Sequence, residues 1–275
     1  MLDAFCWQGT TMLLWGACWG CLCLLLCLGR LRQAPRRVGV AALVCALRYG
    51  IMVSPLYPWA AWLGFKSSAG WVSALGQPVL VVLLLGAVVY ILRWLTPAEA
   101  GLQRVRPGAG RLVAVVVGAV AVAVALNACF AQQDLPARGW GERVFLATLP
   151  GLTEELFYRG VLLGLLGRVF ARHLPLPGAR TSWGGVVSVI LFALAHGLKL
   201  QAYQMELMPA SKLHVSLQGW YYWLPLWHSS AAAQLYYLAM GSLCLWARER
   251  TGSVWAAVGT HCLLNTCLLL GTGLG

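Results

Sequence analysis

The stretch that decides the fold reads Pro150-Gly-Leu-Thr-Glu-Glu-Leu-Phe-Tyr-Arg-Gly160. It lies inside an apolar run from about Val144 to Leu166, which is long enough to cross a bilayer because a span needs about 20 residues. The run nevertheless carries Glu154, Glu155 and Arg159, and each costs roughly 2.5–3.5 kcal/mol at the centre of a membrane helix. We therefore expect compensating partners, and an ionisable cluster inside a membrane is a functional site by default.

The spacing of these side chains divides them into a pair and a single carboxylate. Glu155 and Arg159 are four residues apart, so they share one helix face in the favourable acid-first order and are expected to pair. Glu154 is rotated about 100° away and lacks this partner, which makes it a candidate general base. Pro150 is expected to kink the helix and to free backbone groups, which a membrane tolerates only against protein or a wet cavity. A structural ion pair is the alternative for Glu155 and Arg159.

The composition is that of a polytopic membrane protein rather than a soluble domain. Of 275 residues, 60% are hydrophobic and only 10% are charged. The predicted fold class is therefore all-α, a bundle of about eight transmembrane helices. We expect the spans at about Thr11–Leu28, Val38–Val53, Pro78–Leu92, Leu112–Phe130, Val144–Leu166, Trp183–Leu198, Ala231–Ala247 and Val254–Leu270.

The net charge of +12 follows mainly from arginine in alternate loops. The loops after the first, third, fifth and seventh predicted spans hold 4, 4, 3 and 2 Arg. Under the positive-inside rule these loops are cytoplasmic, so both termini are expected outside, and the charge indicates a lipid bilayer rather than nucleic acid. We expect a multi-pass protein of a bacterial inner membrane, with a four-helix membrane segment at 1–142 and a catalytic membrane core at 143–275.

Two further predicted spans carry polar side chains at helical spacing. Phe192 and His196 share one face of the sixth span, and His261 and Asn265 share one face of the eighth. A lone histidine on an apolar face is usually only a satisfied core residue. Because three separate spans bury polar groups, the arrangement of lowest free energy lets them converge around a wet pocket.

A resemblance to a known family rests on three motifs, Glu154-Glu155-x-x-x-Arg159, Phe192-x-x-x-His196 and His261-x-x-x-Asn265. In order and spacing they resemble the motifs of the CAAX-protease and bacteriocin-processing family, which contains glutamic intramembrane proteases. The resemblance covers about Arg143–Leu270, and the earlier helices match only in being membrane spans.

The resemblance implies a role for each motif residue. Glu154 and His196 would activate a water that attacks the scissile amide, and His261 and Asn265 would stabilise the oxyanion. Glu155, Arg159 and Phe192 would support the site. The chemistry agrees independently, because a carboxylate–imidazole pair can deprotonate water, and amide and imidazole N–H groups can donate to an oxyanion.

Other functions remain open at this point. Zinc is the alternative to a cofactor-free site, with ligands by residue type in Glu154, Glu155, His196 and His261, although the usual H-E-x-x-H motif is absent. A proton-coupled transporter could use the buried carboxylates as a relay, but we find no inverted repeat or paired broken helices. A non-catalytic scaffold for a membrane partner is the third possibility.

The expected partner of the peptidase is a membrane-anchored protein or peptide substrate. The predicted topology puts the pocket in the outer half of the membrane, where the segment 199–230 could cover its mouth. This geometry favours C-terminal processing of a helix-anchored protein, as in a sorting-signal branch of the family that includes myxosortase-like systems. A prenyl-CAAX-type endopeptidase is the alternative.

Overall fold

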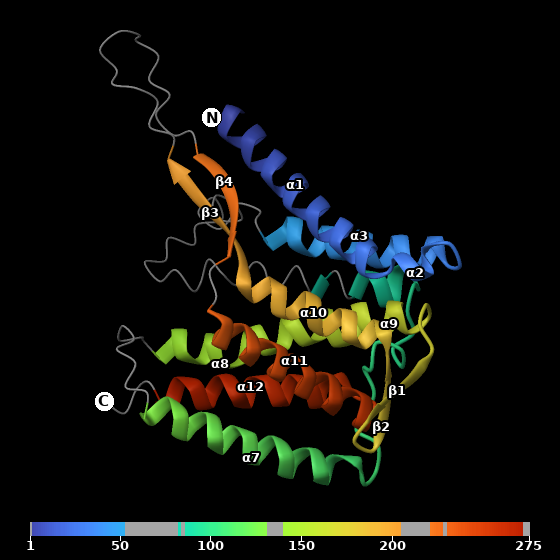
Figure 1. Cartoon of the computed structure of the whole chain (residues 1–275), viewed down its shortest axis with the longest axis vertical. Helices are drawn as coiled ribbons and strands as arrows, with labels where there is room; N and C mark the ends of the chain where they lie inside the picture. The colour runs from blue at the N-terminus through green and yellow to red at the C-terminus, as the bar shows by residue number, and fades with distance from the viewer. Residues whose placement is uncertain are drawn as a thin grey trace.

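The computed structural model describes residues 2–52, 82–83, 86–130, 140–204, 221–227 and 230–271. Within these ranges the chain is a helical bundle with two short antiparallel hairpins (Figure 1). The mostly helical architecture agrees with the predicted all-α class, whereas the eight spans are not confirmed.

The first two predicted spans form a close helical hairpin. It consists of α1 (Leu2–Leu26), the single turn α2 (Leu28–Leu31) and α3 (Pro35–Met52). The two long helices approach closely at Gly16, where an added Cβ would lie 2.5 Å from the carbonyl oxygen of Ala46. Contacts through small residues of this kind are typical of packed membrane helices.

Helix α7 (Ala109–Phe130) corresponds to the fourth predicted span. Its segment Ala109–Asn127 is, among the described residues, the one helix that is both long and apolar enough to cross a membrane. Shorter apolar helices occupy Leu13–Leu26, Trp183–Gly197 and Val254–Leu269. The 15 residues of Trp183–Gly197 extend only roughly 22 Å at 1.5 Å per residue, which is less than the roughly 30 Å of a hydrocarbon core.

The third predicted span, Pro78–Leu92, is described only in part, at 82–83 and 86–92. Its described end contains the π-helical turn η1 (Ala87–Ile91).

The fifth predicted span is a composite of three helical segments. It comprises α8 (Trp140–Glu155), the π-helix η2 (Leu156–Leu162) and α9 (Leu163–Gly167). Helix α8 continues through Pro150, and the change of helix type comes directly after Glu155. Local π-helical geometry is rare and occurs frequently at functional sites.

Three further helices complete the bundle: α10 (Trp183–Gly197), α11 (Ala231–Thr251) and α12 (Val254–Gly271). Helix α12 packs against α7, α8 and α11, and α10 packs against α11 on the other side (Figure 1). A tight turn at Gly252, with φ of +75°, joins α11 to α12. The elements that carry the predicted site motifs are therefore direct neighbours.

The two hairpins lie at opposite ends of the bundle (Figure 1). One consists of β1 (Arg172–Leu176) and β2 (Ala179–Ser182), and the other of β3 (Leu198–Gln204) and β4 (Tyr221–Trp227). No strand was predicted from the sequence. The loop of the first hairpin is Pro177-Gly178 with φ of +63° at the glycine, a turn signal that Pro followed by Gly supplies.

Polar contacts fasten the bundle at the β1–β2 end. Arg168 donates to both carboxylate oxygens of Glu99 at 2.6 Å, and its guanidinium lowers the pKa of Glu99 to about 2. The carboxylate therefore stays ionised throughout the neutral pH range. Arg37 donates to the carbonyl of Arg168 at 2.8 Å, and Arg248 donates to the carbonyl of Glu99 at 3.1 Å. These contacts join α3, α9 and α11 to the chain that precedes α7.

Candidate active site

Glu155 is the centre of a fully buried network. Its carboxylate lies 3.2 Å from Arg159 Nη1 and Nε, and 2.9 Å from His261 Nδ1. Arg159 also donates to the carbonyl of Gly241 at 2.7 Å. Each of these three side chains is at most 2% exposed. These contacts join η2, α11 and α12 around one buried carboxylate, which makes the relative position of the three helices costly to change. The pairing of Glu155 with Arg159 that the spacing predicted is present.

Glu154 faces away from this network and lies near His196. The Oε2 atom of Glu154 lies 3.5 Å from His196 Nε2, and the two side chains are 19% and 23% exposed. His196 Nδ1 lies 2.9 Å from the carbonyl of Phe192. A carbonyl only accepts, so Nδ1 carries a proton, and Nε2 is the nitrogen that faces the carboxylate. The ring of Tyr237 stacks on the imidazole with centroids 4.2 Å apart.

Phe192 lies between the two halves of the site. Its ring centroid is 4.5 Å from that of His196 and 5.9 Å from that of His261. Arg159 Cζ lies 4.6 Å from the same centroid, within the range of a cation–π interaction. The ring of Tyr158 meets Phe192 edge to face at 5.3 Å. Phe192 therefore separates the accessible carboxylate–imidazole pair from the buried network while it contacts both.

The side chain of Asn265 binds a backbone carbonyl that Pro150 leaves without its helical hydrogen bond. Asn265 Nδ2 donates to the carbonyl of Leu146 at 3.2 Å. In a regular helix this carbonyl would accept from the N–H of residue 150, but proline has no N–H. The side chain from α12 thus binds the acceptor that the proline frees in α8. A carboxamide has two N–H donors, so the second remains for another acceptor.

Two glycines allow the helices of the site to approach. A Cβ at Gly151 would lie 2.7 Å from the sulfur and 3.0 Å from the backbone nitrogen of Cys262, which is the neighbour of His261. A Cβ at Gly241 would lie 3.0 Å from Arg159 Nη2 and 3.1 Å from the Phe192 ring. Both glycines are buried. Their missing side chains set the close packing of α8 on α12 and of α11 on η2 and α10.

One group of buried side chains among the described residues has metal-ligand character. Glu155, Cys244 and His261 offer ligand atoms within 4.8 Å of one another. By type this set suits zinc. The fit is poor, because the carboxylate of Glu155 faces the guanidinium of Arg159, which would repel a cation at the same atoms. Glu154 and His196 are not part of this group.

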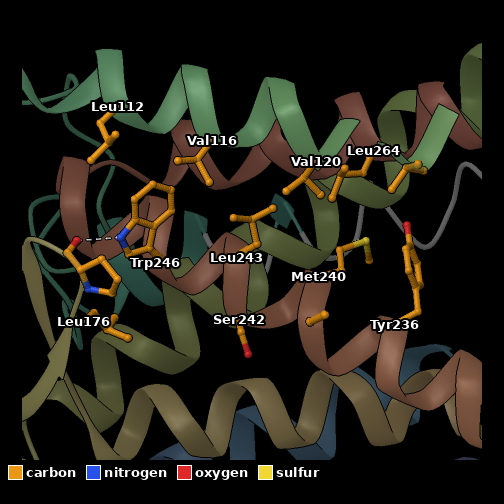
Figure 2. Close-up of a pocket in the computed structure, with 13 residues that line it drawn as sticks. Leu112, Val116, Val120, Leu176, Tyr236, Met240, Ser242, Leu243, Trp246 and Leu264 are labelled. Atoms are coloured by element: carbon orange, nitrogen blue, oxygen red, sulfur yellow. Dashed lines mark hydrogen bonds between the residues drawn. The ribbon is translucent and has the colours of Figure 1, made fainter. Parts of the chain in front are cut away.

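A separate apolar groove of about 580 Å³ runs along α11 (Figure 2). Leu112, Val116 and Val120 line it from α7, and Leu243 and Trp246 line it from α11 (Figure 2). The residues of α11 that face the catalytic side chains, such as Gly241, lie about half a helical turn from those that line the groove. The groove and the polar site therefore occupy opposite sides of α11.

Three contacts of the site have no counterpart in the sequence analysis: the stacking of Tyr237 on His196, the position of Cys244 beside Glu155, and the bond from Asn265 to Leu146. Tyr237 and Cys244 are seven residues apart, with Gly241 between them, so their spacing marks one face of α11. This spacing was the sequence signal from which the positions of Tyr237 and Cys244 could have been predicted. For the bond from Asn265 to Leu146, the sequence signal was the absent N–H of Pro150.

The apolar bundle and its internal carboxylate–histidine centre define the class as a helical membrane protein with a polar site between its helices. Residues 136–267 match the family model described as type II CAAX prenyl endopeptidase Rce1-like, so this part of the chain is similar to that family. The matched region contains every predicted site residue. The match confirms the resemblance to the CAAX-protease and bacteriocin-processing family, whose Rce1-like members are integral membrane proteases, and it does not identify the sorting-signal branch.

Neither the curated proteins nor the solved structures gave a match to this chain.

Proposed function

We propose that the chain is an intramembrane endopeptidase in which Glu154 and His196 activate a water. The observation that carries the proposal is the 3.5 Å approach of Glu154 Oε2 to His196 Nε2. With its proton on Nδ1, a neutral His196 presents a lone pair at Nε2, and the carboxylate also only accepts. A water can donate one O–H to each of them, and transfer of one proton to the carboxylate leaves a hydroxide for attack on the amide carbon.

The buried network supplies the second half of the mechanism. The carboxylate of Glu155 accepts from His261 Nδ1 and stabilises the imidazolium, whose Nε2–H then donates to the oxyanion. Asn265 contributes its second amide N–H. Arg159 and Phe192 keep these groups in place, and the Glu154 carboxyl, which took the proton from the water, gives it to the leaving amine. Every step uses side chains of this chain, and none requires a metal.

The substrate that we propose is a membrane-anchored protein cut near its C-terminus. The predicted topology favours a protein held by a C-terminal helix. A prenylated CAAX-type tail is the second candidate, supported by the family match and by the apolar groove along α11, which offers a surface for a hydrocarbon chain.

The test is cleavage by the purified protein in detergent, with a helix-anchor peptide and a prenylated CAAX peptide as alternative substrates. Glu154→Gln should abolish cleavage and leave the folded protein intact, because the amide keeps the shape but cannot accept the proton. Glu99→Gln is the control, since it alters a carboxylate in the Arg168 pair outside the site. Full turnover by Glu154→Gln would refute the mechanism, and counter-ion-dependent uptake into vesicles without cleavage would favour a transporter.

A further inference from the structure

A second arginine lies buried beside the site, and no acidic side chain that the structure describes forms an ion pair with it. Arg48 of α3 is 5% exposed, and its Nε and Nη1 atoms have no hydrogen-bond partner. Its Cζ atom lies 5.6 Å from the centre of the Phe157 ring, so the guanidinium packs against an aromatic face. The carboxylates whose side chains the structure describes each face another basic group: Glu99, Glu154, Glu155 and Glu249.

The sequence next to α3 does not supply the missing charge. Residues 53–81, which follow this helix directly, contain no Asp or Glu. An arginine within an apolar bundle is costly and marks a substrate or ion pathway by default. An aromatic ring compensates only part of that cost, because a cation–π contact is weaker than a charge-assisted hydrogen bond.

Two contacts show that Arg48 lies at the level of the catalytic carboxylates. Arg37, near the start of α3, donates to the carbonyl of Arg168, and the hydroxyl of Tyr49 bonds to that of Tyr158. Helix α3 is therefore antiparallel to the α8–η2–α9 segment. Arg48, next to Tyr49, lies beside Phe157, which follows Glu154 by less than one turn of η2.

We propose that Arg48 binds a carboxylate of the peptide substrate on the C-terminal side of the scissile bond. Packed helices are about 8–10 Å apart, and an extended chain advances about 3.3–3.6 Å per residue. A carboxylate at Arg48 thus lies about two to three residues beyond a bond held at Glu154. The carboxylate comes from the C-terminus or from an Asp or Glu side chain. This inference rests on the proposed peptidase function and adds the residue that selects the leaving peptide.

The experiment uses three peptides that differ only at the end of the leaving segment. The first has a free C-terminal carboxylate, the second a C-terminal carboxamide, and the third a carboxamide with Asp as its last residue. Each is assayed with the full-length wild type, with Arg48→Gln and with Arg48→Lys. Arg32→Gln is the matched control, because it removes the same charge from an exposed loop position.

The wild type and Arg32→Gln should show a KM about tenfold or more higher for the carboxamide than for the acid, with kcat unchanged, since the lost contact is a charge-assisted hydrogen bond. In Arg48→Gln the KM for the acid should rise to the carboxamide value, and Arg48→Lys should retain part of the preference. Recovery by the Asp peptide assigns the site to a side-chain carboxylate. Equal acid-to-amide ratios in wild type and Arg48→Gln would overturn the proposal.

Binding measurements separate this proposal from the peptidase mechanism. The Kd values of the acid and carboxamide peptides for Glu154→Gln should differ about tenfold even though that variant does not cleave. The same difference should appear in inhibition of the wild type by the leaving peptide in its acid and amide forms, which requires no Arg48 variant to fold. Equal Kd values and equal inhibition would show that Arg48 is a structural cation.

Discussion

Pro150 and Asn265 are the residue pair whose roles the structure links most directly. Pro150 frees the carbonyl of Leu146, and Asn265 binds that carbonyl with one N–H. The bond fixes the orientation of the carboxamide, and hence the direction of its other N–H. A proline within the helix thus positions a side chain that the proposed mechanism uses for the oxyanion.

Pro150→Ala should therefore lower the rate although it strengthens the helix. The new backbone N–H at position 150 would occupy the Leu146 carbonyl and release Asn265, so kcat should fall about tenfold while the melting temperature rises. Asn265→Ala should lower kcat by about 10²–10³, the usual loss for one oxyanion donor. Kinetics of the two single variants and the double variant check this, because Pro150→Ala should cause no additional loss once Asn265 is absent. Additive losses would show that the two residues act independently.

Whether the candidate active site needs a metal also depends on individual residues. We expect activity to survive exhaustive chelation, because the Arg159 guanidinium opposes a cation at Glu155, and the carboxylate–imidazole pair can already activate water. Elemental analysis of the purified protein is the second measurement. Stoichiometric zinc whose removal abolishes activity would reverse the assignment, and Cys244→Ala would then identify the buried group as the ligand set.

At the scale of elements, the close contact of α8 with α12 depends on Gly151. A Cβ there would meet the backbone nitrogen and sulfur of Cys262, so Gly151→Ala should destabilise the protein by about 1–3 kcal/mol and lower activity. Gly259→Ala in α12 is the control, since a Cβ there meets nothing within 4 Å and should be neutral or stabilising. Thermal unfolding in detergent measures both, and Cys262→Ala should restore part of the loss. An unchanged melting temperature for Gly151→Ala would contradict this account.

The sequence predicted elements well where one physical rule dominated. Apolar run lengths located six of the expected helices within a few residues, and the four-residue spacing predicted the Glu155–Arg159 pair. The expectation that the buried polar groups converge around one pocket also predicted that Glu154 lies near His196. The catalytic roles of these two residues remain predictions. Tertiary contacts were the part that sequence could not supply. The bond from Asn265 to Leu146 requires the register of α12 against α8, and the β3–β4 hairpin depends on pairing between distant aromatic and apolar residues.

The whole molecule has two distinct ends. The β1–β2 hairpin lies with the arginine-rich contacts around Glu99 and Arg168, and the β3–β4 hairpin lies at the opposite end (Figure 1). The division into parts at 1–142 and 143–275 stays a prediction, although helices on both sides of that boundary share one apolar core.

We expect reporter fusions after Arg106 and after Gln201 to fall on opposite sides of the membrane. Arg106 donates its backbone N–H to the carbonyl of Thr251 at the arginine-rich end, whereas Gln201 belongs to β3 at the other end. Paired reporters that are active only on one side of the membrane measure the outcome. The Arg106 fusion should report the cytoplasm, and two fusions on the same side would exclude the predicted topology with both termini outside.

The π-helical segment Leu156–Leu162 limits how the chain can change during evolution. A π-turn holds one residue more than the α-turn that it replaces, so the loss of one residue here would restore an ordinary helix. Because the wide turn absorbs this residue, the helices on either side would keep their relative orientation, but the side chains inside the turn, Arg159 among them, would change position relative to Glu155. Insertions and deletions should therefore be excluded from this helix in descendants that keep the activity, and gaps in a sequence alignment belong outside residues 154–162.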